Sequence, residues 1–282
     1  MSKTIVIYGA TGWLGNITLD YLNKREENFN LIPISKRKKE IIFKDKKLQT
    51  ITPNEALKMH SLCIDYFFNY AFLTQEKIKE IGKDMYIEDT NNIINFYDMF
   101  CKNNKIKNSL LISSGAVYWK GTEKENLYDL QKIKQENLFS FTNESNEIDF
   151  IIARVFSVIG NYYETKKNYA FVDFMESARS KNTIKLNSKK RVQRSYLYFD
   201  SLLDYFFETS DSGITIDAWN KNIDILDLAN IISKVYDVNV DVSNGYKNFT
   251  DLDDYTSKND YFKNIANIDI DDNLIKSIFL DK

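Results

Sequence analysis

Tyr128 and Lys132 lie four positions apart in a segment with helical periodicity, Tyr128–Ser140. Residues four apart share one face of a helix, so the phenol and the ammonium would be neighbours. An ammonium beside a phenol favours the phenolate and lowers the tyrosine pKa from its usual value of about 10. Such a tyrosine can exchange a proton with a carbinol or carbonyl oxygen as a general acid or base. Since the chain has 18 tyrosines, the pair alone also fits two surface residues.

A serine precedes this pair in a position that favours chemistry. Ser114 belongs to the segment SSGAVY (113–118), which follows a predicted strand over Ser109–Ser113. Ligands of open parallel sheets bind at the carboxyl ends of the strands. A serine hydroxyl of this segment could therefore donate a hydrogen bond to a substrate carbonyl.

A glycine-rich turn at the N-terminus predicts where a nucleotide binds. The segment KTIVIYGATGWLG (3–15) reads as a buried strand over Thr4–Tyr8, three glycines, and the start of a helix. Gly9 would permit the tight turn, Gly12 would let the backbone approach a pyrophosphate, and Gly15 would let the helix pack closely. The helix N-terminus would then direct its N–H groups at the phosphates. The chain has only nine glycines, so three at these offsets argue for a dinucleotide site.

The elements that must position these residues alternate along the first half of the chain. Alternating strands and helices with strongly apolar strands predict an α/β fold, a Rossmann-like doubly wound parallel sheet with helices on both faces. Further strands are predicted over Leu31–Ser35, Lys47–Ile51, Cys63–Tyr70 and Phe150–Phe156, and a helix over Asp89–Asn103.

The pattern loosens from about Ser157 onward. Helices over Tyr169–Ser180 and Leu226–Tyr236, and strands over Thr183–Leu186 and Ser195–Phe199, predict a smaller C-terminal α/β lobe. We expect residues 1–156 to form the dinucleotide-binding domain. Residues 157–282 would mainly form the substrate-binding lobe, with some segments returning to the first domain.

Composition narrows the class of protein. The 38 basic and 40 acidic residues leave a net charge of −2, which gives no argument for nucleic acid or a membrane surface. No apolar run approaches the roughly 20 residues of a membrane span, and no leader pattern is present, which predicts a cytoplasmic protein. Cys63 and Cys101 fall in apolar patterns and are expected to be buried free thiols. The single histidine, His60, argues against a histidine-based metal site, and no metal is expected.

Three motifs in order, GATGWLG (9–15), SSGAVY and YxxxK, resemble the extended short-chain dehydrogenase/reductase family, the NAD-dependent epimerase/dehydratase group. The resemblance implies that Ser114, Tyr128 and Lys132 are catalytic. It extends to RVFSVIG (154–160) and RSYLYFD (194–200), and the arginine of the latter binds the substrate diphosphate in the family. The implied cofactor-binding residues are Gly9, Thr11, Gly12, Trp13, Leu14, Gly15, Ser35, Lys36, Arg37, Tyr70, Ala71, Tyr128 and Lys132. The implied substrate-binding residues are Ser114, Ser157, Asn161, Arg194 and Tyr198.

Two departures from the family pattern concern the substrate side. The segment between SSGAVY and Tyr128 is shorter than is usual in the family, so a substrate-facing loop is trimmed. Ser157 stands where the family usually has asparagine.

Other positions indicate which branch of the family is resembled. The family's 4,6-dehydratases carry an Asp-Glu pair after the catalytic residue, and its decarboxylases keep a glutamate there. This chain has Gly115 and Ala116, which excludes both activities. NAD users place a carboxylate at the end of the second strand. Here Ser35 is followed by Lys36 and Arg37, which favours NADP(H) over NAD(H) because cations can hold a 2′-phosphate.

The leading hypothesis is NADPH-dependent reduction of the C4 keto group of a nucleotide-linked (deoxy)sugar, in bacterial surface-polysaccharide biosynthesis. Two alternatives stay open: an NAD-dependent nucleotide-sugar 4-epimerase, and a non-catalytic NADP-sensing protein. The resemblance also implies a homodimer that pairs the helices over Asp89–Asn103 and Tyr128–Ser140. Neither the base nor the sugar follows from the sequence.

Overall fold

The computed structural model describes residues 2–163, 169–243, 246 and 251–280. The chain forms two compact units. Unit 1 comprises Met1–Arg154 and Phe206–Ile216, and unit 2 comprises Val155–Tyr205 and Asp217–Lys282. The assignment of substrate binding to the C-terminal lobe stays a prediction.

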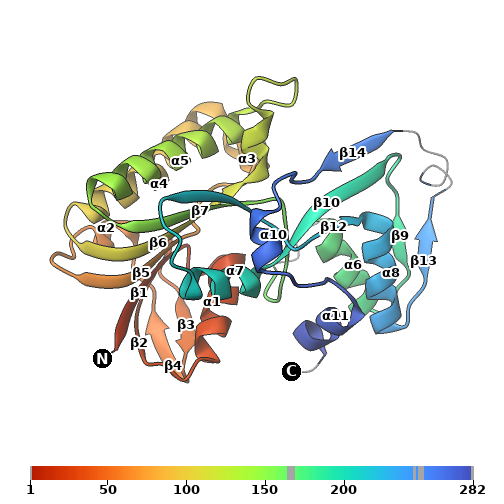
Figure 1. The fold of residues 1–282 in the computed structure, drawn as a ribbon, viewed down its shortest axis with the longest axis horizontal. Helices are drawn as coiled ribbons and strands as arrows, with labels where there is room; N and C mark the ends of the chain where they lie inside the picture. Colours follow the sequence, from red (N-terminus) through yellow and green to blue (C-terminus); the bar gives the residue numbers. More distant parts are fainter. Residues whose placement is uncertain (1, 164–168, 244–245, 247–250, 281–282) are drawn as a thin grey trace. The chain divides into compact units, whose positions relative to one another are not determined.

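Unit 1 is built on a six-stranded sheet in the order β11-β7-β6-β5-β1-β2 (Figure 1). The pairings β1–β2, β1–β5 and β5–β6 are all parallel. Because β1 has β2 on one side and β5 on the other, the winding of the chain reverses at β1, where such folds bind their ligands. The predicted Rossmann-like α/β fold is thus confirmed. The strands are β1 (Lys3–Tyr8), β2 (Phe29–Ile34), β5 (Cys63–Asn69), β6 (Lys105–Ser114), β7 (Asp149–Val155) and β11 (Ile214–Ala218).

Neighbouring phenylalanines on β5 show how helices cover both faces of the sheet. Successive strand residues point to opposite faces. Phe67 packs edge-on against Tyr97, with ring centroids 5.0 Å apart, and Phe68 packs against Phe206 at 5.4 Å. Tyr97 belongs to α4 (Lys83–Cys101), which lies beside α5 (Leu127–Ser145) on one face. Phe206 belongs to α7 (Phe199–Glu208), and α7 covers the other face with α1 (Trp13–Asn23), as Figure 1 shows.

The strand predicted over Lys47–Ile51 forms over Lys46–Gln49, but it does not join the central sheet. The structure forms a hairpin of β3 (Glu40–Phe43) and β4 (Lys46–Gln49), which pair with each other and not with the central sheet. Lys44 and Asp45 make its turn at φ 48° and 59°, a left-handed geometry that suits a two-residue hairpin. Only Ile51 reaches the sheet, through a single parallel bridge to Ile34.

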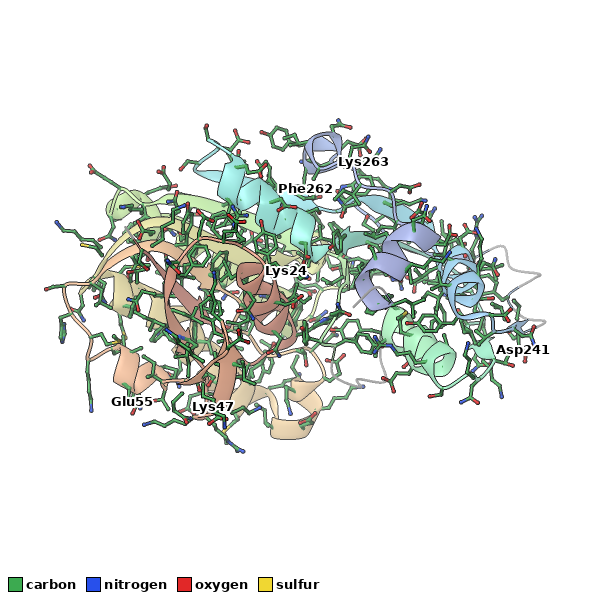
Figure 2. The ribbon with its side chains drawn as sticks, turned by 90° about the horizontal axis from the view of Figure 1, so that it is seen from below. Lys24, Lys47, Glu55, Asp241, Phe262 and Lys263 are labelled. Carbon is green, nitrogen blue, oxygen red and sulfur yellow. The ribbon has the colours of Figure 1, made fainter. Side chains whose placement is uncertain are left out.

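Unit 2 contains a second sheet in the order β12-β10-β14, with β8 also pairing with β10. The predicted strand over Ser195–Phe199 lies within β10, except that Phe199 begins α7. Phe262, labelled in Figure 2, is buried and packs edge-on against Tyr205. The strands are β8 (Ser157–Ile159), β9 (Ile184–Leu186), β10 (Arg191–Tyr198), β12 (Lys221–Asp224), β13 (Val240–Val242) and β14 (Leu252–Tyr255). The helices are α6 (Ala170–Arg179), α8 (Ile225–Tyr236), α10 (Tyr261–Ile265) and α11 (Asp272–Phe279).

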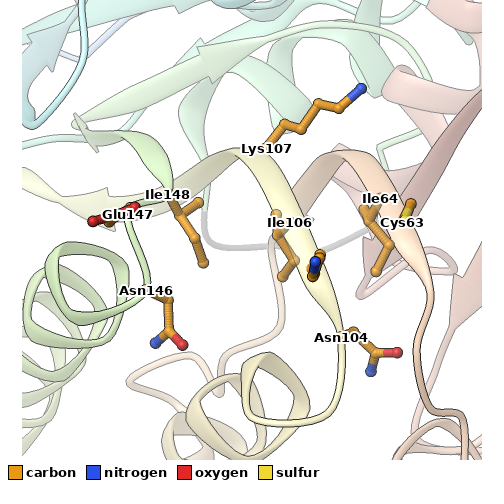
Figure 3. Close-up of a pocket in the computed structure, with 9 residues that line it drawn as sticks. Cys63, Ile64, Asn104, Ile106, Lys107, Asn146, Glu147 and Ile148 are labelled. Atoms are coloured by element: carbon orange, nitrogen blue, oxygen red, sulfur yellow. The ribbon is translucent and has the colours of Figure 1, made fainter.

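Cys63 is exposed, which corrects the expectation of a buried thiol, whereas Cys101 is buried. The apolar pattern that suggested burial begins at Ile64. Cys63 is the first residue of β5 and lies at the end of the sheet where its parallel strands begin. It lines a cavity of about 400 Å³ at the amino ends of β5 and β6 (Figure 3). The glycine turn lies at the opposite end of the sheet, where β1 ends.

No helix within the described ranges is long and apolar enough to cross a membrane. A cytoplasmic location stays a prediction.

Candidate active site

The glycine turn has the close contacts that its sequence predicts. Gly9 adopts φ +98°, and the N–H groups of Gly9 and Ala10 donate to the Ile34 carbonyl at 2.9 and 3.1 Å. A Cβ at Gly15 would lie 2.4 Å from the Gly9 carbonyl oxygen and 2.6 Å from that of Ala10. Gly15 is therefore required because α1 packs onto the backbone of the turn, and a side chain there would push the two apart.

The N-terminus of α1 is suited to an anion. Gly12 occupies the N-cap, is exposed, and no side chain of the described residues caps the helix. The first helical residues, Trp13 and Leu14, follow it, and Thr11 lies half-buried in the turn. A helix N-terminus without a side-chain cap offers N–H groups and a positive dipole end to a phosphate.

The end of β5 lies against this turn. A Cβ at Gly9 would lie 3.0 Å from the backbone nitrogen of Ala71, so the turn and the residues after β5 are in close contact. The Tyr70 hydroxyl shares a 2.9 Å hydrogen bond with Thr18 of α1. Burial raises the pKa of Tyr70 far above its usual range, so this hydroxyl stays protonated and braces α1. The predicted cofactor contacts of Tyr70 and Ala71 stay predictions.

The end of β2 is followed by a loop that carries Ser35, Lys36 and Arg37. The buried Ser35 hydroxyl donates to the Arg37 carbonyl at 2.6 Å and shares a 2.7 Å hydrogen bond with Thr50. Lys36 forms a 3.0 Å ion pair with Asp89, although 78% of the Lys36 side chain is exposed. Arg37 is exposed, and its guanidinium has no ion-pair partner among the described residues. Ser35 thus shapes the loop, and Arg37 is its available cation.

Helix α5 carries Tyr128 and Lys132 one turn apart. It begins with a capping box in which Asn126 accepts from the Tyr128 N–H at 2.9 Å and Asp129 accepts from the Asn126 N–H at 3.0 Å. This cap sets Tyr128 in the first turn. Ser114 ends β6, and its hydroxyl caps the short 3₁₀ helix η1 (Gly115–Trp119) by accepting from the Ala116 N–H at 3.2 Å.

The Lys132 ammonium is buried between three groups. It donates to the Ile112 carbonyl at 2.9 Å and to Gln135 Oε1 at 3.0 Å, and it lies 3.9 Å from the centroid of the Phe72 ring. Burial lowers the pKa of Lys132 to about 7, and the carboxylate of Glu136 acts in the opposite direction. The bond to Ile112 ties Lys132 to the strand that ends at Ser114.

Sequence reasoning missed the residues around this ammonium. Phe72 also packs edge-on against Tyr128, with centroids 5.8 Å apart. Glu136 is engaged by Arg154 of β7 through two hydrogen bonds, 3.0 Å from Nε and 2.7 Å from Nη2. The sequence carries no signal for these contacts, because they join a loop, a helix and a strand that are distant along the chain.

Four buried polar atoms of unit 1 have no hydrogen-bond partner within the described ranges: Asn69 Oδ1, Ser113 Oγ, Asp129 Oδ1 and Gln135 Nε2. Buried polar atoms in native proteins nearly always have partners. Asn69 ends β5 and Ser113 precedes Ser114 at the end of β6, whereas Asp129 and Gln135 lie on α5, where Gln135 contacts Lys132. Together with the uncapped helix and the glycine turn, they fit a bound nicotinamide dinucleotide.

The predicted substrate residues of unit 2 already have partners inside the unit. Arg194 of β10 donates to the Asp253 carbonyl and carboxylate, both at 2.7 Å. Asn161 donates to the Ile278 carbonyl at 2.8 Å, and the Tyr198 hydroxyl donates to Asp200 at 2.9 Å. Ser157 lies on β8, in register with Tyr196 of β10. Their roles in binding stay predictions.

No set of three or more His, Cys, Asp or Glu side chains in the described part of the chain is arranged to hold a metal ion.

The comparison with family models identifies one match. The model described as "Epimerase: NAD dependent epimerase/dehydratase family" matches residues 5–212. Among curated proteins, no significant sequence match to the chain was found.

Solved structures with the same fold include two 4-epimerases and an NADPH complex. UDP-N-acetylglucosamine 4-epimerase from Methanobrevibacter ruminantium M1, in complex with UDP-N-acetylmuramic acid, is 20% identical with a TM-score of 0.70, over 98% of this chain and 96% of that one. UDP-glucuronic acid 4-epimerase from Bacillus cereus, with UDP-glucuronic acid and NAD, is 18% identical with a TM-score of 0.63, over 85% of each chain. RMD from Pseudomonas aeruginosa, complexed with NADPH, is 16% identical with a TM-score of 0.64, over 92% and 88%.

Proposed function

The chain belongs to the NAD dependent epimerase/dehydratase family, and from this premise we propose that it reduces the C4 keto group of a nucleotide-linked sugar with NADPH. The observation that carries the proposal is the end of β2, where Arg37 is exposed and has no ion-pair partner among the described residues, and where Ser35, Lys36 and Arg37 follow the strand in place of a carboxylate. A carboxylate there would bind the ribose 2′-hydroxyl of NAD, whereas a guanidinium matches a 2′-phosphate. An enzyme that consumes NADPH is typically a net reductase.

The proposed chemistry assigns one step to each side chain of the site. When bound, a nicotinamide cofactor supplies the hydride that reduces C4. Ser114 donates a hydrogen bond to the C4 oxygen, and Tyr128 gives its phenolic proton to that oxygen as the alkoxide develops. Lys132 holds the nicotinamide ribose hydroxyls and stabilises the tyrosinate that remains. Gly115 and Ala116, buried in η1, offer no acid or base for a dehydration.

The cofactor preference can be measured directly. We expect NADPH to bind more than about tenfold more tightly than NADH, a difference of at least about 1.4 kcal/mol. Arg37→Ala should remove most of this preference, because it deletes the available guanidinium. Fluorescence titration with both cofactors measures the two affinities.

A neighbouring cation serves as the matched control. Lys38 is paired with Glu55 at 2.5 Å, so Lys38→Ala should leave the preference largely intact. Equal affinities in the wild type, or tighter binding of NADH, would contradict the NADP assignment and favour an epimerase.

A nucleotide-sugar 4-epimerase is the second candidate. It is supported by two compared structures of the same fold, whose proteins are 4-epimerases. An epimerase recycles its cofactor, so the purified protein would retain NAD(H) and would interconvert C4 epimers without net consumption.

Incubation with a panel of nucleotide-linked 4-keto-6-deoxy sugars decides between these functions. A reductase consumes NADPH stoichiometrically with one member of the panel, as followed by NADPH absorbance. Cofactor binding without turnover of keto sugars or of C4 epimers would instead favour the non-catalytic NADP-sensing protein. The nucleotide base and the pathway, which we place in bacterial surface-polysaccharide synthesis, follow from the sugar that reacts.

We also propose a homodimer formed through α4 and α5. Four large apolar side chains of these helices are exposed, most of all Phe141 with 63% of its surface. Burying such side chains against a second copy would be favourable. Phe141→Glu should therefore shift the mass measured by light scattering from dimer to monomer; a wild-type monomer would refute the proposal. The four residues are Met85, Met99, Leu130 and Phe141.

A further inference from the structure

Phe72 lies against both members of the proposed catalytic pair. The Lys132 Nζ atom is 3.9 Å from the centroid of its ring, and the ring meets that of Tyr128 edge-on at 5.8 Å and 80°. Phe72 is half-buried in the loop that follows β5, one residue after Ala71, which touches the glycine turn. A single ring therefore contacts the ammonium and the phenol next to the proposed cofactor site.

The Lys132 ammonium has few partners that favour its charge. Its hydrogen-bond acceptors are the Ile112 carbonyl of β6 and the Gln135 side-chain oxygen of α5, both neutral. Glu136 on the same helix favours the charge, but its carboxylate also accepts two bonds from Arg154 of β7. The Phe72 ring, from the loop after β5, lies against the ammonium and is itself in edge-on contact with Tyr128.

An aromatic face can stabilise such a charge. The ring quadrupole attracts a cation within about 6 Å of the centroid, and the attraction is strongest where water is excluded. Lys132 is only 4% exposed, so water is largely excluded and the cation–π attraction at 3.9 Å is strong. The contact favours the ammonium over the neutral amine.

We propose that Phe72 is a positioning residue that keeps Lys132 charged and oriented beside Tyr128 through the π face of its ring. The inference rests on the proposed function for its catalytic meaning, because a charged Lys132 is what stabilises the tyrosinate. In the protein without substrate or cofactor, the ring raises the pKa of Lys132 and so opposes burial, which lowers that pKa. Removing the ring's π electrons should lower the pKa of Lys132.

The test is a direct titration of Lys132 by NMR. Protein carrying ¹³C-labelled lysine reports the protonation of each amine, and Lys132→Met identifies the resonance. We expect Phe72→Leu to lower the Lys132 midpoint by about one pKa unit, the size of a desolvated cation–π contact. Phe72→Tyr, which retains the aromatic face, should keep the wild-type midpoint. Phe156→Leu is the matched control, because its ring packs against Tyr255 in unit 2.

A second variant keeps the test decisive if Phe72→Leu fails to fold. Phe72→4-cyanophenylalanine keeps the ring but withdraws its π electrons, so it should also lower the midpoint. The proposal would be overturned if the Lys132 midpoint were unchanged in the 4-cyanophenylalanine variant. It would also be overturned if the midpoint were unchanged in Phe72→Leu. A rise of the midpoint in the leucine variant would also overturn it, because it would show that the ring acts mainly by excluding water from Lys132.

The titration separates this inference from the proposed function. It requires neither substrate nor turnover, so a shifted midpoint in a protein that reduces no keto sugar would refute the function alone. If the enzyme is an active reductase but the Phe72 variants have the wild-type Lys132 midpoint, only the role of Phe72 would be refuted. In an active enzyme, Phe72→Leu should also move the alkaline limb of the pH–rate profile to lower pH, because Lys132 then loses its proton earlier.

Discussion

Tyr128→Phe is expected to lower turnover of the keto sugar by about two to four orders of magnitude, the range for losing a general acid. The substitution removes only the hydroxyl, so the ring keeps its edge-on contact with Phe72. The capping box that starts α5 also survives, because Asn126 contacts the backbone N–H of residue 128 and not its side chain. The loss should therefore appear in kcat, as measured by NADPH consumption under saturating substrate.

Two measurements accompany this experiment. NADPH affinity should be nearly unchanged, since the phenol is not a main anchor of the cofactor. Tyr261→Phe, a substitution of an exposed tyrosine on α10 in unit 2, should retain full turnover. Near-normal turnover of Tyr128→Phe would mean that the YxxxK spacing is coincidental.

Arg194→Ala is expected to weaken nucleotide-sugar binding by about 10- to 100-fold, the equivalent of one charge-assisted hydrogen bond of about 1.5–3 kcal/mol. A guanidinium can hold phosphate oxygens through two parallel bonds. In the free protein Arg194 is already bound to Asp253 at 2.7 Å, so a diphosphate must compete with that carboxylate. NADPH affinity should hardly change.

The competing carboxylate makes this prediction sharper. Asp253→Asn keeps the shape of the partner but removes its charge, so nucleoside diphosphates should bind more tightly to that variant. Arg191→Ala, three residues earlier on β10 and paired with Asp224, is the matched control and should bind as the wild type does.

Thermal unfolding measures ligand binding in each of these variants, because a ligand that binds only the native state raises the melting temperature by mass action. UDP, GDP, CDP and dTDP form the panel. If none of them shifts the wild-type melting temperature, the nucleotide-sugar assignment loses its main support. The fold and the cofactor site would stand, and the reductase of a smaller carbonyl compound would become the better hypothesis.

The glycine turn and the central strands could be predicted because their signals are local. A buried parallel strand is an apolar run. Position 15 tolerates only glycine, because a Cβ there would lie 2.4 Å from the Gly9 carbonyl oxygen. The pair Tyr128 and Lys132 was predictable for the same reason, since helical spacing alone makes the two residues neighbours.

The third strand shows where local signals fail. Lys47–Ile51 has strand-like residues, and the structure does extend them, but pairing with Glu40–Phe43 takes them out of the sheet. The choice of partner depends on a hairpin turn at Lys44 and Asp45, which adopt positive φ without a glycine, so the sequence gives only a weak turn signal.

The sequence by itself determined the type of fold, the glycine turn and the identity of the proposed catalytic residues, because each depends on residues within one turn or one strand. Only the tertiary structure decided the electrostatics of the site. Phe72, Gln135 and Ile112 meet at the Lys132 ammonium from a loop, a helix and a strand, and burial among them sets its charge. The same holds for Arg194, whose partner Asp253 lies 59 residues away along the chain. Charges respond to distance in space, and that distance is known only once the chain has folded.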